Sequence, residues 1–308
     1  MIKRTLCFSN PAYLSLRNGQ MVIKLPEVEK ANVPNLIKQE STRTIPIEDI
    51  GMIMIDNKQI TITSGLIDQL ISNNVVIVAC DQNHMPIGIM QSLTANSLQN
   101  ERYRTQLEAS LPLKKQLWQQ TIQAKIRNQA TLLRRLHHTE VGNMIAWSNS
   151  IKSGDSENLE GRAASYYWKN FFPTIAHFTR DREGVAPNNL LNYGYAILRA
   201  IVARSLISSG LLLTIGIHHQ NKYNAYCLAD DIMEPYRPYI DEKVYTLFQK
   251  GVDTLTTEVK TTFLQIPIYD VYLNNQNCTL HYAVAQTTAS LYRCFAGESK
   301  KLLYPEMQ

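Results

Sequence analysis

The sequence predicts an α+β protein in which a small N-terminal β-sandwich domain, residues 1–95, precedes an all-α domain, residues 96–308. Three observations support this prediction. The chain of 308 residues is longer than one hydrophobic core usually serves. Its first third contains short apolar runs separated by turn signals, as strands do. After a change near residues 92–97, apolar residues recur three and four positions apart, as on helices.

The N-terminal strands are predicted from short runs rich in β-branched and apolar residues. Asn18-Gly19 separates two of these runs and suits a type I′ hairpin turn, because both central positions of that turn need a positive φ. Residues 65–72 have helical spacing, so the first domain is expected to be a small β-sandwich, or a sheet domain, with one helix. The predicted strands are residues 5–8, 13–16, 21–24, 43–46, 52–55, 60–63 and 75–79.

Helices dominate the second domain. Glu160 follows a polar loop and opens one helix, for which Asn158 is the candidate N-cap. The other helices, predicted from apolar residues at helical spacing, are residues 96–110, 112–136, 190–208, 231–249 and 286–295.

Composition limits the cellular setting and the class of partner. A formal net charge of +5 mildly favours polyanions, since excess Lys and Arg concentrate phosphates nearby. The five cysteines are odd in number and lack a Cys-x-x-Cys pair, which indicates reduced thiols and argues against a zinc knuckle. Residues 1–10 contain no apolar signal core, and residues 206–217 are too short to cross a bilayer, which takes roughly 20 apolar residues. We therefore expect a cytoplasmic protein without membrane association.

Three residues are the best candidates for chemistry: Glu160, His219 and Glu234. Two carboxylates and one imidazole suit Mg²⁺ or Mn²⁺, whereas a structural zinc site would normally recruit thiolates. Such a cation could act on a phosphodiester, which is the chemistry of cutting or joining DNA. No Gly-x-Ser-x-Gly elbow, Walker A loop or Gly-x-Gly-x-x-Gly fingerprint competes with this interpretation.

Asp231 is an auxiliary candidate because it lies three residues before Glu234, so on a helix the two carboxylates share a face. Proline is tolerated in the first helical turn, and Pro235 therefore predicts that both acids lie at a helix N-terminus. Pro238 predicts a kink or a restart soon afterwards.

Structural roles for these residues remain open at this stage. Glu160 could be a capping acid, the acids at 231 and 234 could pair with Arg237, and His218-His219 could form a hydrogen-bonded turn. Nearby basic residues suit phosphate contacts, but they could equally be ion-pair partners. These candidate DNA contacts are Arg162, Lys169, Arg199 and Arg237.

Taken together, the motifs resemble one family, the CRISPR-associated integrase usually called Cas-one, in the form that accompanies type II systems. The resemblance runs nearly end to end. In the first domain it rests on residues 9–16, 45–55 and 56–63, and in the second on residues 111–118, 191–195 and 231–238. One departure is Ser165, where the family commonly has a basic residue; Arg162 is the candidate replacement for that phosphate contact.

The resemblance implies a helical catalytic domain whose metal ligands are Glu160, His219 and Glu234, with Asp231 as a nearby acid. It implies a metal-dependent DNA endonuclease and integrase of antiviral defence, which uses Mg²⁺ or Mn²⁺. In spacer acquisition the enzyme would join the 3′-hydroxyl of a short DNA fragment to the CRISPR repeat by transesterification.

The implied partners are double-stranded DNA, as spacer precursor and as CRISPR repeat, a second copy of the chain and a dimer of the small protein Cas-two. The N-terminal domain would serve dimerisation and partner contacts. Other type II adaptation proteins and the effector nuclease would also cooperate. Two rivals remain: a stand-alone nuclease that cuts branched DNA in repair, and a non-enzymatic DNA-binding scaffold whose acids only pair with arginines.

Overall fold

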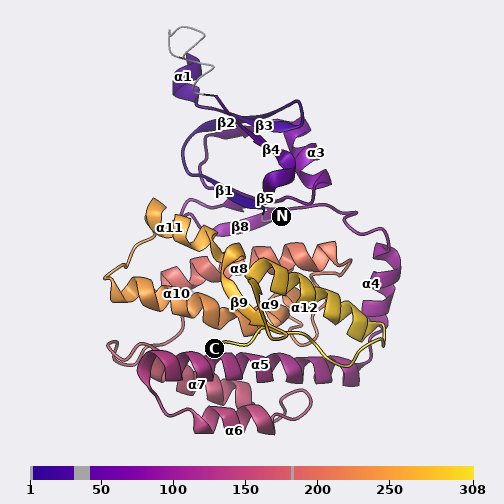
Figure 1. The fold of residues 1–308 in the computed structure, drawn as a ribbon, viewed down its shortest axis with the longest axis vertical. Helices are drawn as coiled ribbons and strands as arrows, with labels where there is room; N and C mark the ends of the chain where they lie inside the picture. The colour runs from indigo at the N-terminus through magenta and orange to yellow at the C-terminus, as the bar shows by residue number, and fades with distance from the viewer. Residues whose placement is uncertain (1–2, 31–41, 182–183) are drawn as a thin grey trace. The chain divides into compact units, whose positions relative to one another are not determined.

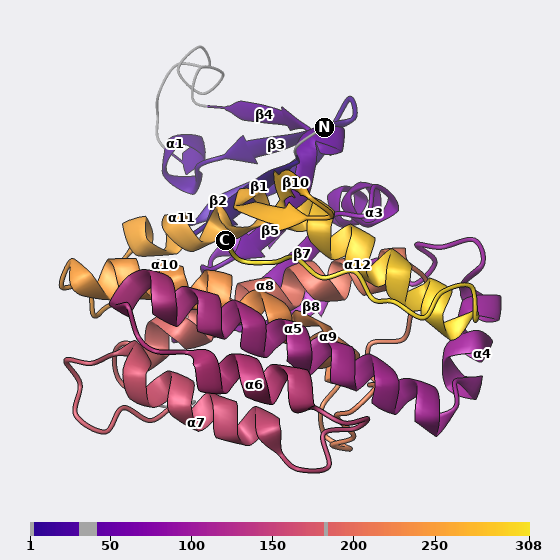
Figure 2. The same cartoon turned by 60° about the horizontal axis from the view of Figure 1, so that its bottom comes forward.

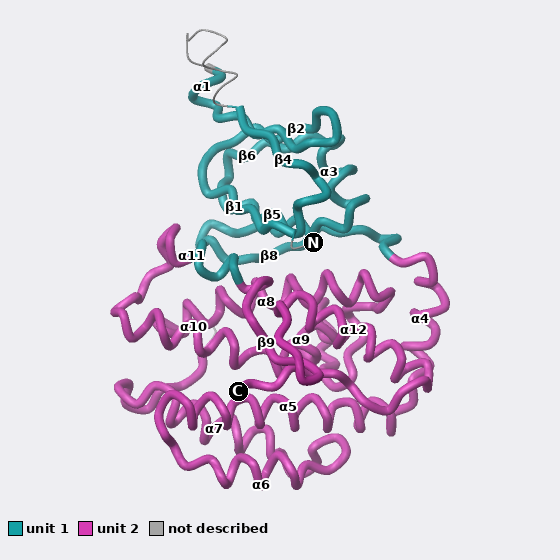
Figure 3. The backbone as a smooth tube through the Cα atoms, viewed as in Figure 1, with its two compact units in different colours: residues 1–95, 260–265 teal, residues 96–259, 266–308 magenta. Residues whose placement is uncertain are grey.

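The computed structural model describes residues 3–30, 42–181 and 184–308 (Figure 1). The chain forms two compact units (Figure 3). Unit 1 comprises Met1–Ala95 together with Lys260–Gln265, and unit 2 comprises Asn96–Val259 and Ile266–Gln308. A short segment late in the sequence therefore belongs to the N-terminal unit.

Unit 1 contains two four-stranded sheets, where the sequence predicted a sandwich or a sheet domain. One sheet has the order β1-β5-β7-β8, with its first three strands parallel and β8 antiparallel. Its strands are β1 (Arg4–Phe8), β5 (Ile50–Ile55), β7 (Val76–Cys80) and β8 (Pro86–Met90). The sequence analysis missed β8.

The second sheet has the order β4-β3-β2-β6. Its strands are β2 (Ala12–Arg17), β3 (Gln20–Lys24), β4 (Arg43–Pro46) and β6 (Ile60–Ile62). The β2–β3 hairpin closes with Arg17 opposite Gln20, and the two residues between them, Asn18 and Gly19, have φ values of 50° and 71°. The predicted hairpin turn is therefore confirmed.

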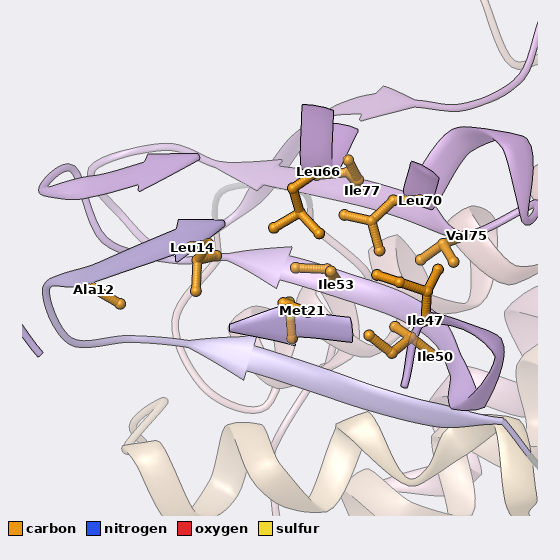
Figure 4. Packing of buried hydrophobic residues seen from close by; sticks show 10 residues of the cluster. All are labelled: Ala12, Leu14, Met21, Ile47, Ile50, Ile53, Leu66, Leu70, Val75 and Ile77. Atoms are coloured by element: carbon orange, nitrogen blue, oxygen red, sulfur yellow. The ribbon is translucent and has the colours of Figure 1, made fainter. Parts of the chain in front are cut away.

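The core of unit 1 draws on both sheets and on the helix α3 (Ser64–Ser72) (Figure 4). Leu14 and Met21 come from the second sheet, Ile53 and Ile77 from the first, and Leu66 from α3. Two short elements, α1 (Pro26–Lys30) and the 3-10 turn η1 (Ile47–Asp49), complete the described part of unit 1 before residue 95.

The late segment of unit 1 supplies a buried ion pair. Asp56 is fully buried at the end of β5, and its Oδ2 lies 2.9 Å from Nζ of Lys260. The other oxygen, Oδ1, lies 2.9 Å from Nδ1 of His84. A buried carboxylate needs such partners, because an unpaired charge in the interior is costly. The pair thus fastens residues 260–265 to the first sheet.

Unit 2 is helical, so the predicted order of a strand-rich part followed by a helical part is confirmed. Its longest helix, α5 (Leu111–His137), starts after the N-cap Ser110 and ends at His138, which has a φ of 51°. Within unit 2, α5 lies between the α6–α7 pair and the segment formed by α9, η2 and α10 (Figure 2). The remaining helical elements of unit 2 are α4 (Gln99–Glu108), α6 (Gly142–Ser150), α7 (Leu159–Phe171), α8 (Asn188–Ser208), α9 (Cys227–Met233), η2 (Glu234–Tyr236), α10 (Arg237–Gln249), η3 (Ile266–Ile268) and α12 (Leu280–Phe295). Helix α11 (Thr257–Leu264) begins in unit 2 and ends in unit 1.

The all-α prediction for this part needs one correction. A β-hairpin joins β9 (Asp270–Leu273) to β10 (Gln276–Thr279). Asn274 and Asn275 form its turn with φ values of 49° and 63°, a conformation that asparagine tolerates better than most residues. This two-residue turn was a readable signal that the sequence analysis did not use.

Helix α8 is long and apolar enough to pass for a membrane span by length and composition alone. However, 67% of its most apolar window is buried inside the protein. Core helices of globular proteins pass the same test, so α8 is weak support for a membrane span. Its buried residues include Leu191, Leu198 and Leu206, which lie in the interior of unit 2.

Candidate active site

Glu160 stands in the first turn of α7, but other side chains cap that helix. Asp155 accepts from the backbone N–H groups of Leu159 and Glu160, both at 2.9 Å. The predicted N-cap Asn158 accepts from Gly161 N at 3.2 Å. The Glu160 carboxylate is therefore not needed as a hydrogen-bonding cap, and it contacts Lys125 instead.

Glu234 lies where a helix is interrupted, which corrects the predicted helix start. Asp231 belongs to the last turn of α9, Glu234 begins the 3-10 turn η2, and α10 starts at Arg237. Pro235 has no N–H to donate to the carbonyl four residues earlier, so the α-helical pattern breaks there. The single helix predicted over residues 231–249 is thus divided, and the restart near Pro238 is confirmed.

Lys125 of α5 brings the two glutamates together. Its Nζ lies 2.7 Å from Oε1 of Glu160 and 2.6 Å from Oε2 of Glu234. Lys125 donates a hydrogen bond to Oε1 of Glu160. Its contact with Oε2 of Glu234 is an ion pair without hydrogen-bond alignment. Only 10% of the Lys125 side chain and 8% of the Glu234 side chain are exposed, so solvent screens these charges little.

The charges around Glu234 keep its carboxylate ionised. Burial alone would raise its pKa, but the positive charges of Arg237 and Lys125 outweigh burial and lower the pKa to about 2. Arg237 Nε lies 2.7 Å from Oε1 of Glu234. Burial would lower the Lys125 pKa, yet the two glutamates raise it above its usual value. The site therefore holds two carboxylates and two cations.

His219 lies in the loop between α8 and α9, and Asp231 holds it there. The Asp231 carboxylate accepts from the backbone N–H groups of Ile217, His218 and His219 at 2.7, 3.0 and 3.2 Å. His219 Nδ1 lies 2.5 Å from Asp231 Oδ1. Since the acceptor is a carboxylate, Nδ1 carries the proton and Nε2 is left as the free ring nitrogen. This hydrogen bond with Asp231 raises the His219 pKa.

Trp118 and Gly216 give the histidine loop its close packing. The Trp118 ring stacks on His218 with centroids 4.1 Å apart and planes within 1°, and it meets the edge of His219 at 5.8 Å. A Cβ at Gly216 would lie 2.5 Å from the His219 carbonyl oxygen and 2.6 Å from Asp231 Oδ2. The loop can therefore wrap around the carboxylate only with glycine at this position.

His219 also lines an open cavity of about 490 Å³. Lys114 and Lys222 contribute positive charge to its wall, and Tyr223 contributes an aromatic ring that is 84% exposed. A cavity with lysines and an exposed ring beside the histidine suits an anionic, base-bearing ligand.

The candidate metal ligands fit a hard divalent cation by their chemistry, although the described residues do not form a ready cluster. Across residues 3–30, 42–181 and 184–308, no three His, Cys, Asp or Glu side chains are placed to hold a metal ion. Instead, an ammonium group stands between Glu160 and Glu234. Two carboxylates that converge on one cation, each with an oxygen against the Lys125 ammonium, are suitable oxygen donors for Mg²⁺ or Mn²⁺.

Two of the four predicted DNA contacts form ion pairs with acids, which was the alternative to phosphate binding. Arg199 Nε lies 2.7 Å from Asp230 Oδ1, and Arg237 pairs with Glu234. Arg162 is exposed and lies over the Trp147 ring at 5.8 Å. Lys169 is also exposed. Phosphate binding by these residues stays a prediction.

A buried acid that the sequence analysis did not single out fixes the helices around the site. Asp241 of α10 accepts hydrogen bonds from Tyr167 of α7, at 2.9 Å, and from Tyr195 of α8. Burial raises the pKa of Asp241 to about 6, although both tyrosines and the nearby positive charges oppose the rise. The Tyr195 ring also lies under Arg237, 4.5 Å from the guanidinium carbon. The Tyr195 side chain is itself buried.

Comparison with known proteins gives the family. The chain is 32% identical to the CRISPR-associated endonuclease Cas1 of Neisseria meningitidis serogroup C (strain 8013), over 100% of this chain and 97% of that protein. Its fold is similar to that of a casposase bound to integration product, with a TM-score of 0.76, 20% identity and 98% and 92% of the two chains covered. It is also similar to part of a Cas6-RT-Cas1–Cas2 complex, with a TM-score of 0.75, 20% identity and 99% and 36% covered. Residues 6–275 match the family described as CRISPR associated protein Cas1, so this chain belongs to the Cas1 family.

Proposed function

We propose that this protein is a metal-dependent DNA integrase and endonuclease of CRISPR adaptation. One observation carries the proposal: in a Cas1-family chain, Glu160 and Glu234 converge on a single cation, and the histidine that Asp231 orients has its pKa raised by Asp231 and also by Glu234. The names of the similar proteins support it, since one is a CRISPR-associated endonuclease and another is a casposase bound to integration product.

In the proposed reaction, the 3′-hydroxyl oxygen of a short DNA fragment attacks a phosphorus atom in the CRISPR repeat. One phosphodiester bond forms as another breaks, and the displaced 3′-oxygen leaves with a proton, so no external energy source is needed. Glu160, Glu234 and Nε2 of His219 would hold Mg²⁺ or Mn²⁺, which supplies Lewis-acid stabilisation of charge on the phosphate. Asp231 keeps the imidazole in the required tautomer, and Arg237 keeps Glu234 ionised.

The proposed partners follow from the same family membership. Double-stranded DNA would be bound as spacer precursor and as repeat, in agreement with the net charge of +5. A homodimer would associate with a Cas2 dimer, which the similar Cas6-RT-Cas1–Cas2 complex supports. Cooperation with other type II adaptation proteins, a cytoplasmic location and a role of residues 1–95 in dimerisation belong to the same proposal.

An integration assay tests the proposal. The purified protein and its Cas2 partner are mixed with a short duplex bearing free 3′-hydroxyls, a supercoiled plasmid with the repeat, and Mg²⁺ or Mn²⁺. Joining at the repeat should require the metal and disappear in Glu160→Gln. The matched control is Glu157→Gln, a neighbouring exposed acid that pairs with exposed Lys152.

The other outcomes separate the rival functions. If wild type alone cuts branched DNA and joins nothing, the protein is a repair nuclease rather than an integrase. If wild type and Glu160→Gln act on DNA equally, the acids are structural and the proposed site is wrong. DNA binding without any strand cutting or joining in either protein would identify a non-enzymatic scaffold.

A further inference from the structure

The Lys125 ammonium occupies the space between the two glutamates of the candidate site, where a metal ion would be expected. This ammonium contacts an oxygen of Glu160 at 2.7 Å and an oxygen of Glu234 at 2.6 Å, and the helix α5 that carries it lies between the elements bearing those acids. With Arg237 against Glu234, two positive charges balance two negative charges. Nothing in the sequence motifs drew attention to this lysine.

This balance has a consequence for metal binding. A divalent cation placed between the same two carboxylates would leave two extra positive charges in a poorly screened site, where like charges repel strongly. The Lys125 side chain is long and has rotatable carbons, so its ammonium can leave without moving α5. Arg237 contacts the opposite oxygen of Glu234 and need not move.

We infer that Lys125 is an internal counter-cation that occupies the space between Glu160 and Glu234 and is displaced when a divalent metal binds there. Lys125 is thus a positioning residue. It keeps the two acids together and charge-balanced before the metal arrives, and it lowers the affinity of the site for metal. This inference rests on the proposed function, because it takes Glu160 and Glu234 as the metal ligands.

Direct metal binding, measured without DNA, tests the competition. Free Mn²⁺ is counted by electron paramagnetic resonance during titration of wild type, Lys125→Met and the control Lys115→Met. The control removes the same charge from an exposed position of the same helix. Lys125→Met should bind Mn²⁺ at least about tenfold more tightly than wild type, because a competing unit charge is gone. Lys115→Met should match wild type, and equal affinity of all three proteins would overturn the inference.

A second measurement uses wild type alone, so it holds even where Lys125→Met folds poorly. A short pulse of acetic anhydride acetylates accessible lysines, and mass spectrometry reads each peptide. Mn²⁺ should increase the acetylation of Lys125 several-fold and leave that of Lys115 unchanged. Unchanged or reduced labelling of Lys125 at saturating Mn²⁺ would mean that the ammonium stays between the acids.

Measuring Mn²⁺ binding by Glu160→Gln distinguishes an error in the proposed metal site from an error in the inference about Lys125. If this variant binds Mn²⁺ as wild type does, the proposed metal site itself is wrong, and the inference falls with it. If Glu160→Gln weakens Mn²⁺ binding while Lys125→Met fails to strengthen it, the metal site stands and only the displacement of Lys125 is disproved.

Discussion

Asp231 fixes His219 twice, because its carboxylate accepts from both the backbone N–H and the imidazole Nδ1 of that residue. Asp231 also accepts from the two preceding backbone N–H groups, so it organises the whole turn. Both of its oxygens are therefore occupied. Its principal role in this structure is to orient the histidine, rather than to add another free oxygen beside it.

Asp231→Asn should destabilise the protein and impair DNA joining together. An amide offers one acceptor oxygen, and its NH₂ group would face donors that need an acceptor. We expect a loss of about 2–3 kcal/mol in the free energy of unfolding, measured with urea. Asp253→Asn, at an exposed position, is the control and should change neither property. A wild-type urea midpoint for Asp231→Asn would show that the turn does not depend on the carboxylate.

Gly216→Ala should also destabilise the protein and impair joining, but by steric crowding rather than by the loss of a charge. Its Cβ would meet the His219 carbonyl oxygen and the Asp231 carboxylate, so the loop must shift, at a cost of about 1–3 kcal/mol in unfolding free energy. Joining activity should fall with it. Gly65→Ala is the contrast, because its Cβ meets nothing within 4 Å in a helix and should raise stability by about 0.5–1 kcal/mol. Equal effects of both substitutions would contradict the crowding at Gly216.

Asp241 should make stability depend on pH in an unusual direction for an aspartate. Its pKa rises from the usual 3.8 to about 6 in the folded protein, so the folded state holds the proton more tightly than the unfolded state. The stabilising contribution is full below 3.8 and is lost as pH rises through about 6.

Urea unfolding of wild type and Asp241→Asn across that pH range measures this contribution. The wild type should lose about 1–3 kcal/mol relative to the variant between the two pKa values. The variant itself should be weaker at low pH, because its amide leaves Tyr167 or Tyr195 without a good acceptor. Parallel pH profiles for the two proteins would show that Asp241 titrates normally.

Lys260→Met should destabilise unit 1. Removing the ammonium takes the lysine charge away from the buried Asp56 carboxylate, at a cost of about 3–5 kcal/mol in unfolding free energy. Adding Asp56→Asn should recover part of that loss, because the uncompensated charge disappears. Thermal unfolding followed by circular dichroism checks both, with exposed Lys58→Met as the control. If the double variant is no better than Lys260→Met alone, the cost does not come from the stranded charge.

The elements that the sequence predicted well depend on local rules. The Asn18-Gly19 turn needs positive φ at neighbouring residues, and α7 needs a cap at Asn158; both signals lie within a few residues of the structure that they specify. The failures have physical reasons too. Pro235 was taken to start a helix, whereas it interrupts one that has already begun at Cys227.

The candidate site was predictable only in part. Glu160, His219 and Glu234 were recognised through motifs, and the contact of both glutamates with Lys125 places those two acids together. Lys125 itself was overlooked, although it lies seven residues after Trp118 on the buried face of α5, where a lysine requires a charged partner. The partners of Asp231 and Asp241 lie on other segments, and no local pattern in one sequence specifies such pairings.

The ion pair between Asp56 and Lys260 joins residues 204 positions apart within one unit. During synthesis the ribosome therefore releases nearly all of the N-terminal unit long before the lysine that neutralises its buried aspartate. Until Lys260 emerges, the Asp56 carboxylate lacks its lysine partner. Unit 1 is therefore synthesised first, but it can complete its fold only after residues 260–265 have been synthesised. A nascent chain arrested before residue 260 should expose the end of β5 to protease.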